Sequence, residues 1–140
     1  LVNYSPNLLK ILGTEMSQAL INVKHPEQRL FQAIIVQAFE DCVYSTCSKK
    51  DAYNKEDSYK WFNDADEDFE QVCWFADMDP IFVKDRFLKL RRDKTIHFNK
   101  TELLWMEYRE KYRRYRAAKS KEARRIIKRQ IDRLPVPEKD

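Results

Sequence analysis

Glycine is almost absent from this chain, since it occurs once in 140 residues, at Gly13. Sandwiches, barrels and hairpin meanders need many residues with positive φ, which glycine adopts most easily, so these β architectures are disfavoured. A P-loop and a dinucleotide-binding loop each require at least two glycines at fixed spacing, and the sequence therefore excludes both. The expected fold class is all-α.

Cysteine and histidine are scarce as well. Three cysteines (Cys42, Cys47 and Cys73) and two histidines (His25 and His97) show no spacing typical of a zinc site. An odd number of cysteines does not suggest a disulfide framework. Because Cys42 and Cys73 fall on apolar helical faces, we expect buried free thiols in a reducing compartment. Neither a metal ion nor another cofactor is expected.

Long apolar runs and catalytic motifs are missing too. No segment approaches the ~18 apolar residues of a membrane span, and no signal peptide can be recognised. We therefore expect a cytoplasmic protein without a membrane partner. Neither histidine has a neighbouring motif typical of a catalytic triad, so we expect a binding protein and not an enzyme.

Long helix-forming stretches dominate what is present, and we predict five to seven helices. A helical domain is expected over residues 1–98, a long basic helix or helix pair over residues 99–134, and a tail over residues 135–140. Residues 29–43 are apolar on more than one helical face, which is typical of a buried central helix. The predicted core residues are Leu30, Ile34, Phe39, Phe69, Val72, Cys73, Val83 and Phe87.

Local signals place several helix ends. Residues 49–54 are polar and are predicted to be a connection, with a short helix over residues 55–62. Asn99 followed by Glu102 has the spacing of a capping box, which predicts a helix start. Residues 116–125 are apolar only at alanines, so a kink or a second helix is expected near Ser120.

Residues 69–88 have the layout of a helix-turn-helix, and the whole unit is expected over residues 66–91. Cys73 is small where the two helices must cross closely. Asp77 stands where such a turn usually has a glycine in the left-handed region, which aspartate tolerates better than most residues. An ordinary helical hairpin explains the same pattern. As a DNA-reading helix, the second helix would use its basic residues, which are Lys84, Arg86, Lys89, Arg91 and Arg92.

Charge is distributed unevenly along the chain. Residues 51–79 carry ten acidic and two basic side chains, whereas residues 84–133 carry nineteen basic and seven acidic ones. A basic segment of this kind favours a polyanion, and double-stranded DNA is the expected partner, with RNA as an alternative. A solvated helical surface is the competing interpretation. The candidate phosphate contacts in the C-terminal helices are Arg109, Arg113, Arg114, Arg116, Lys119, Arg124, Arg125 and Lys128.

Two protein partners also remain open. The acidic segment 56–79 fits a protein partner such as RNA polymerase or a host factor, in which case the chain is a protein–protein interaction module. Ile126, Ile127 and Ile131 are expected to require cover by a partner helix, which makes a homodimer the other possibility. Five carboxylates could bind Mg²⁺, but they stand where helix starts favour acids, so no metal site is predicted. These carboxylates are Asp64, Asp66, Glu67, Asp68 and Glu70.

Three short segments, residues 59–62, 68–73 and 79–86, together resemble small helical proteins of phage and prophage genomes that contain a helix-turn-helix. The resemblance covers about thirty residues. It implies DNA binding and transcriptional control in the cytoplasm of a bacterial host cell, or DNA packaging in the manner of a small terminase subunit. It implies no catalytic residues. Asp77 departs from the usual turn residue.

Overall fold

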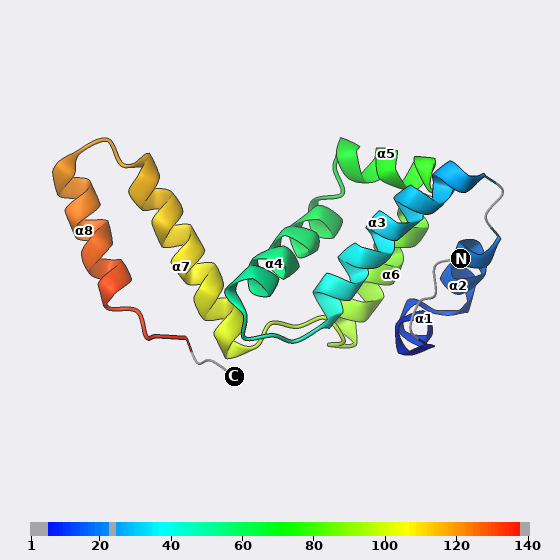
Figure 1. The fold of residues 1–140 in the computed structure, drawn as a ribbon, viewed down its shortest axis with the longest axis horizontal. Coiled ribbons are helices and arrows are strands. Elements are labelled where there is room, and N and C mark those ends of the chain that lie inside the picture. The colour runs from blue at the N-terminus through cyan, green and yellow to red at the C-terminus, as the bar shows by residue number, and fades with distance from the viewer. Residues whose placement is uncertain (1–5, 23–24, 138–140) are drawn as a thin grey trace. The chain divides into compact units, whose positions relative to one another are not determined.

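The computed structural model describes residues 6–22 and 25–137, and these residues form helices and connections without any β-strand. The predicted all-α fold is thus confirmed (Figure 1). Eight helices are present in the described residues, one more than the expected maximum. They are α1 (Pro6–Leu12), α2 (Thr14–Ile21), α3 (Pro26–Val43), α4 (Lys49–Asp64), α5 (Glu67–Phe75), α6 (Pro80–Arg92), α7 (Lys100–Ala117) and α8 (Lys121–Asp132).

The chain divides into two compact units that interleave in sequence. The first unit contains Leu1–Tyr44 and Asp57–His97, and the second contains Ser45–Glu56 and Phe98–Asp140. Helix α4 therefore contributes its first half to the second unit and its last half to the first. A single domain boundary at residue 98 would place residues 45–56 in the first unit, although they belong to the same compact unit as the C-terminal helices.

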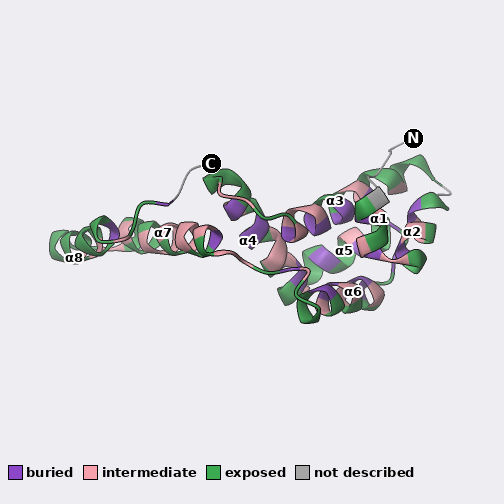
Figure 2. Ribbon diagram, turned by 90° about the horizontal axis from the view of Figure 1, so that it is seen from below, coloured by how far each residue is buried: buried purple, intermediate pink, exposed green. Residues whose placement is uncertain are grey.

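Aromatic rings form the centre of the first unit. Phe39 of α3 and Phe62 of α4 have ring centroids 4.4 Å apart, and Phe62 stacks on Phe87 of α6 at 5.1 Å. Phe69 of α5 meets the edge of Phe62 at 6.0 Å. All four side chains are fully buried. Figure 2 shows buried stretches of ribbon on α3 and α6 in purple. Cys73 and Val83 are buried too, so five predicted core residues are confirmed, namely Phe39, Phe69, Cys73, Val83 and Phe87.

The predicted core positions Leu30 and Ile34 are wrong. Their side chains are 65% and 42% exposed, because α3 turns Ile35, Val36 and Phe39 toward its neighbours instead. A helix that is apolar on several faces gives no periodic signal for which face is inward. Val72, which was also a predicted core residue, is half-buried.

The predicted connection over residues 49–54 is also wrong, because these residues form the first turns of α4. The hydroxyl of Ser48 accepts a hydrogen bond from the backbone N–H of Asp51 at 3.3 Å, which satisfies one of the free amides at a helix start. Ala52 and Lys55 on this stretch are buried. Tertiary contacts thus stabilise a helix whose sequence is polar.

Helices α5 and α6 are joined by four residues, and α5 ends in a Schellman motif. The N–H of Asp77 bonds to the carbonyl of Trp74 at 3.1 Å, and the N–H of Met78 bonds to that of Cys73 at 2.9 Å. Asp77 has φ 59°, so it adopts the left-handed conformation that the turn pattern requires. Asp79 then caps α6 by accepting the N–H of Ile81 at 2.9 Å.

The cysteines lie as expected where they fall on helices. Cys42 and Cys73 are buried, whereas Cys47 is half-buried, and no disulfide joins them in the described residues. Burial raises the pKa of the Cys73 thiol to about 12, and the charges of Asp79 and Glu70 act in the same direction. Cys73 is therefore a thiol and not a thiolate at neutral pH, which makes it a poor nucleophile.

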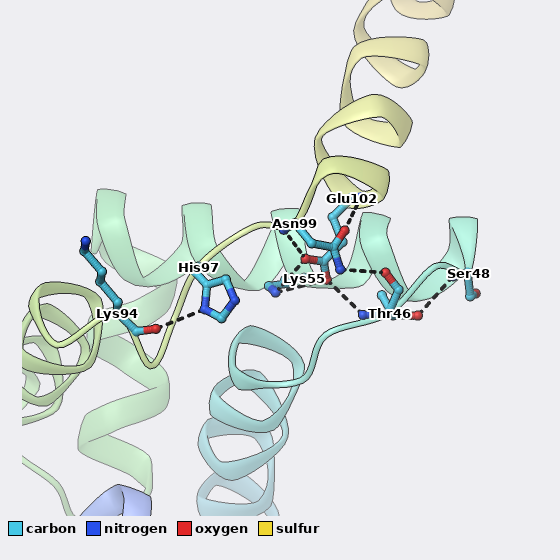
Figure 3. Close-up of polar contacts among 7 residues, drawn as sticks. All are labelled: Thr46, Ser48, Lys55, Lys94, His97, Asn99 and Glu102. Carbon is cyan, nitrogen blue, oxygen red and sulfur yellow. Dashed lines mark hydrogen bonds and ion pairs between the residues drawn. The ribbon is translucent and has the colours of Figure 1, made fainter. Parts of the chain in front are cut away.

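The start of α7 is held by a buried carboxylate in the second unit (Figure 3). Glu102 accepts hydrogen bonds from Lys55 Nζ at 2.9 and 3.0 Å and from the N–H of Thr46 at 3.3 Å. With Asn99 it forms the predicted capping box, in which each side chain accepts from the other residue's backbone N–H. Lys55 and Glu102 are both essentially fully buried.

Candidate nucleic-acid interface

Helices α7 and α8 form an antiparallel hairpin within the second unit (Figure 1). The second helix begins after Ser120, whose hydroxyl accepts the N–H of Ala123 at 3.1 Å, so a helix pair divided near Ser120 is confirmed. Tyr108 of α7 donates its hydroxyl hydrogen toward the carbonyls of Leu134 and Pro135, at 3.2 and 3.0 Å. The chain after α8 is thereby held against α7.

The isoleucines of α8 are mostly covered within this hairpin. Ile131 is buried and Ile127 is half-buried, because α8 packs against α7. Ile126 alone of the three is exposed, at 51%. The expectation that these isoleucines need a partner helix is therefore wrong for Ile127 and Ile131, and the argument for a homodimer loses its main support.

Cations are concentrated on the outside of the hairpin. Residues 109–133 carry twelve basic and three acidic side chains, a net charge of +9. Within the part of the chain that the structure describes, six of these cations are exposed and have side chains that form neither an ion pair nor a hydrogen bond. They are Arg116, Lys119, Lys121, Arg125, Arg129 and Arg133.

A hollow of about 390 Å³ lies between the two helices and is lined almost entirely by cations. Its walls are Tyr115 of α7 and five basic side chains of α8, namely Lys121, Arg124, Arg125, Lys128 and Arg129. A site with this lining attracts an anion such as a phosphate, and arginine can hold phosphate oxygens with two parallel hydrogen bonds. Tyr115 adds an aromatic ring of the kind on whose face bases stack.

Three of the predicted phosphate contacts are partly neutralised by carboxylates. Glu110 accepts hydrogen bonds from Arg113 at 2.6 and 2.9 Å and from Arg114 at 3.2 Å. The hydrogen bonds from Arg113 are the main cause that lowers the pKa of Glu110 to about 2. Lys128 pairs with Asp132 at 3.3 Å, and this bond raises the pKa of Lys128.

Arg109 lies apart from the exposed cations. Its guanidinium donates to Glu56 Oε1 at 3.0 Å and to the carbonyl of Tyr53 at 3.3 Å, and it also lies over the Tyr53 ring. Burial is the main cause that raises the pKa of Tyr53. Arg109 therefore joins α7 to the first half of α4, and the structure gives it a role inside the unit.

The basic residues of α6 are used largely within the first unit. Lys84 donates to the backbone carbonyls of Phe62 and Asn63 in the last turn of α4, the former at 2.8 Å. Arg86 donates to the carbonyl of Ile11 in the last turn of α1. Helix C-termini carry partial negative charge and free carbonyls, so both cations cap the end of a neighbouring helix.

The three remaining basic residues of α6 differ in whether they bond to another residue of the first unit. Arg91 donates to Asn63 Oδ1 at 2.9 Å, although it stays exposed. Lys89 and Arg92 are exposed and, among the described residues, have no polar partner. Together with Asp85 and Leu88, the three cations line an open hollow of about 800 Å³ on the surface of α6.

The acidic residues before α5 serve as local hydrogen-bond acceptors. Asp66 accepts the N–H of Phe69 as the helix cap, and Asp68 accepts Trp61 Nε1 at 2.8 Å. No group of three or more His, Cys, Asp or Glu side chains within residues 6–22 and 25–137 is arranged to hold a metal ion. None of the described helices is both long and apolar enough to cross a bilayer.

No protein-family model, curated protein or solved structure matches this chain. Function has to be inferred from the geometry of the chain itself. The basic surface of the α7–α8 hairpin is the feature with the most specific chemistry, because five exposed cations of α8 line one hollow.

Proposed function

We propose that this protein binds double-stranded DNA and that the α7–α8 hairpin makes the phosphate contacts. The observation that carries the proposal is the set of six exposed cations without an ion pair or a side-chain hydrogen bond, three of which line the hollow beside Tyr115. A surface that only keeps a helix soluble needs no such excess of one sign. Unneutralised cations on rigid helices, in contrast, replace the counterions of a nucleic acid.

The positions of the cations along α8 fit a continuous row. Lys121, Arg125 and Arg129 are spaced by four residues, so they lie on one side of the helix, about 6 Å apart along its axis. Contacts to phosphates give affinity but no preference for a base sequence. If the six unpaired cations each contact one phosphate, log K should fall with log salt at a slope near −5.

The binding experiment is a fluorescence-anisotropy titration of a random-sequence duplex at several salt concentrations. Replacing Lys121, Arg125 and Arg129 by glutamine should weaken binding by more than tenfold at 50 mM salt and reduce the slope by about 2.7. A matched control replaces three exposed cations outside the hairpin, Lys10, Arg29 and Lys50, and should change little. No binding at 50 mM salt, or equal losses in both triple variants, would refute the proposal.

We further propose that the protein acts as a transcriptional regulator in which α6 reads the base sequence. The support is its exposed pair Lys89 and Arg92, together with a left-handed Asp77 in the preceding turn. Replacing Lys89 and Arg92 by alanine should then reduce the ratio between the affinity for a selected DNA site and the affinity for random DNA. The hairpin variant should lower both affinities by the same factor. An unchanged affinity ratio would show that α6 does not read the base sequence and that binding is independent of sequence. Tighter binding to duplex RNA than to duplex DNA would make RNA the partner.

A further inference from the structure

An apolar groove lies on the first unit, between α3 and the last half of α4. It has a volume of about 510 Å³, and its apolar walls are formed by Leu30, Ala33, Ile34, Ala38 and Trp61. Leu30 and Ile34 are one turn apart on α3 and are 65% and 42% exposed. Contiguous apolar side chains in contact with water mark interaction surfaces more often than isolated ones do. The groove uses none of the residues proposed to bind DNA.

The dimensions of the groove fit one helix. Its α3 wall extends from Leu30 to Asp41, which is about 16 Å or three helical turns. Ala33 and Ala38 are small, so the backbone of an added helix can approach closely between the larger Leu30, Ile34 and Trp61. An amphipathic helix that binds in this way places apolar residues at positions i, i+4 and i+7 in the groove.

Charge at one end of the groove selects the partner. Asp41 and Asp57 line that end, and neither lysine nor arginine is among the described residues that line the groove. The carboxylate of Asp41 is held in position, because it accepts hydrogen bonds from Gln37 Nε2 at 2.9 Å and from the Ser58 hydroxyl at 3.4 Å. These neutral donors orient the carboxylate but leave its charge in place. A partner with cations near this end would neutralise it.

We propose that this groove binds an amphipathic helix of a partner protein, with lysine or arginine one turn beyond its apolar stripe. A second copy of the chain fits less well, because pairing two grooves face to face brings four carboxylates together with no cation from the lining. The exposed Ile126 of α8 is likewise a single apolar residue and not a stripe. The chain would then join a partner protein to DNA through two separate surfaces.

The test uses a fluorescein-labelled synthetic helix with leucines at i, i+4 and i+7 and two arginines one turn beyond, together with a peptide in which glutamates replace the arginines. The arginine peptide should bind at least tenfold more tightly than the glutamate peptide. Ile34→Asp should weaken its binding at least tenfold, and Ile81→Asp, a control at a more exposed isoleucine on α6, should not. Replacing Asp41 and Asp57 by asparagine should remove most of the preference for arginine.

Three results would overturn the inference. The arginine peptide fails to bind, or Ile34→Asp and Ile81→Asp have equal effects, or sedimentation shows a dimer that Ile34→Asp dissociates. The last result would make a second copy the occupant. Ile34 is partly exposed, so its variant should fold, and circular dichroism checks this. Because Ile34→Asp leaves the hairpin cations unchanged, its DNA affinity should equal that of the parent protein, which separates this inference from the proposed function.

Discussion

Lys55 and Glu102 form an ion pair from which water is almost entirely excluded. Removing two charges from water is costly, and the mutual attraction compensates only when further hydrogen bonds satisfy the carboxylate. Glu102 meets this condition, since the N–H groups of Thr46 and Asn99 also bond to it. The ring of Phe98 lies 5.1 Å from Lys55 Nζ and shields the ammonium. The pair therefore fixes the start of α7 to α4.

Removing one partner of this pair should be strongly destabilising. Glu102→Gln leaves the Lys55 ammonium buried opposite a neutral amide, and the free energy of unfolding should fall by about 3 to 5 kcal/mol. Urea denaturation followed by circular dichroism measures the change. The double variant Lys55→Met with Glu102→Leu should lose less than the two single variants added together. Additive losses would show that the charges do not stabilise each other.

Gly13, the single glycine of the chain, has a backbone conformation that favours glycine. It separates α1 from α2 with φ 92°, and a Cβ atom there would lie 3.2 Å from Cζ of Arg86. Gly13→Ala should lower the free energy of unfolding by about 1 to 3 kcal/mol from the backbone conformation alone, because φ 92° with ψ 166° is a region that only glycine adopts readily. Crowding of the Arg86 guanidinium, which caps α1, adds to this loss. The exposed neighbour Thr14 provides the control, since Thr14→Ala should change stability by less than about 0.5 kcal/mol.

Sequence reasoning succeeds at single residues where the signal is local. The capping box of Asn99 and Glu102 was predictable because both partners lie within four residues of each other. Sequence reasoning offered Lys84 and Arg86 as DNA-reading residues, whereas both reach along apolar stems to cap other helices. Those acceptors, in α4 and α1, are 22 and 75 residues away. No local pattern reports a contact at such separations.

At the scale of an element, α7 contains a carboxylate that neutralises two of its own arginines. Glu110 ties up Arg113 and Arg114, so Glu110→Gln should release both guanidinium groups and raise DNA affinity several-fold at 50 mM salt. Glu122→Gln removes the same charge from the same hairpin without freeing an arginine, and its effect should be smaller. Fluorescence anisotropy compares the two variants. Equal gains would mean that net charge alone matters.

The pair of Glu110 with Arg113 stabilises the fold over a defined pH range. Its folded-state pKa of about 2 lies below the ordinary value of about 4.3, so the pair with Arg113 stabilises the fold fully above that ordinary value. The contribution is lost as the pH falls toward 2. Because the group is exposed, the effect on global stability should be small. NMR titration of the Glu110 carboxyl should show its pKa return toward the ordinary value in Arg113→Ala.

Elements were predicted well where a break has a chemical cause. The division between α7 and α8 follows from Ser120 and the alanines around it. The start of α6 follows from Asp79 and Pro80. The inward face of α3 was not predictable, since both Leu30 and Ile35 continue an apolar pattern. The candidate groove was missed for the same reason, because Leu30 and Ile34 in its wall were assigned to the core.

On the scale of the whole molecule, the second unit is assembled from two distant segments. Three side chains of α7 bind residues 45–56: Glu102 bonds to Lys55, Trp105 Nε1 donates to the carbonyl of Cys47 at 3.0 Å, and Arg109 pairs with Glu56. A fragment of residues 99–140 lacks all of these partners.

This fragment should therefore be much less helical than α7 and α8 are in the full chain, because isolated helices of this length are marginal in water. Circular dichroism at 222 nm measures the helix content. Adding a peptide of residues 45–56 at high concentration should restore part of the signal, and a peptide with Lys55→Met should restore less. A fragment that is fully helical alone would show that the hairpin needs no support from α4.

The interleaving of the two units also sets an order of events during synthesis. Lys55 leaves the ribosome 47 residues before Glu102, a delay of about 2 to 10 seconds at ordinary elongation rates. All residues of the first unit lie before residue 98, so its aromatic centre is complete in sequence while residues 45–56 still await α7. The first half of α4 must pass this interval with its future buried surface in water. The surface that we propose to bind DNA thus forms after the groove that we propose to bind a partner.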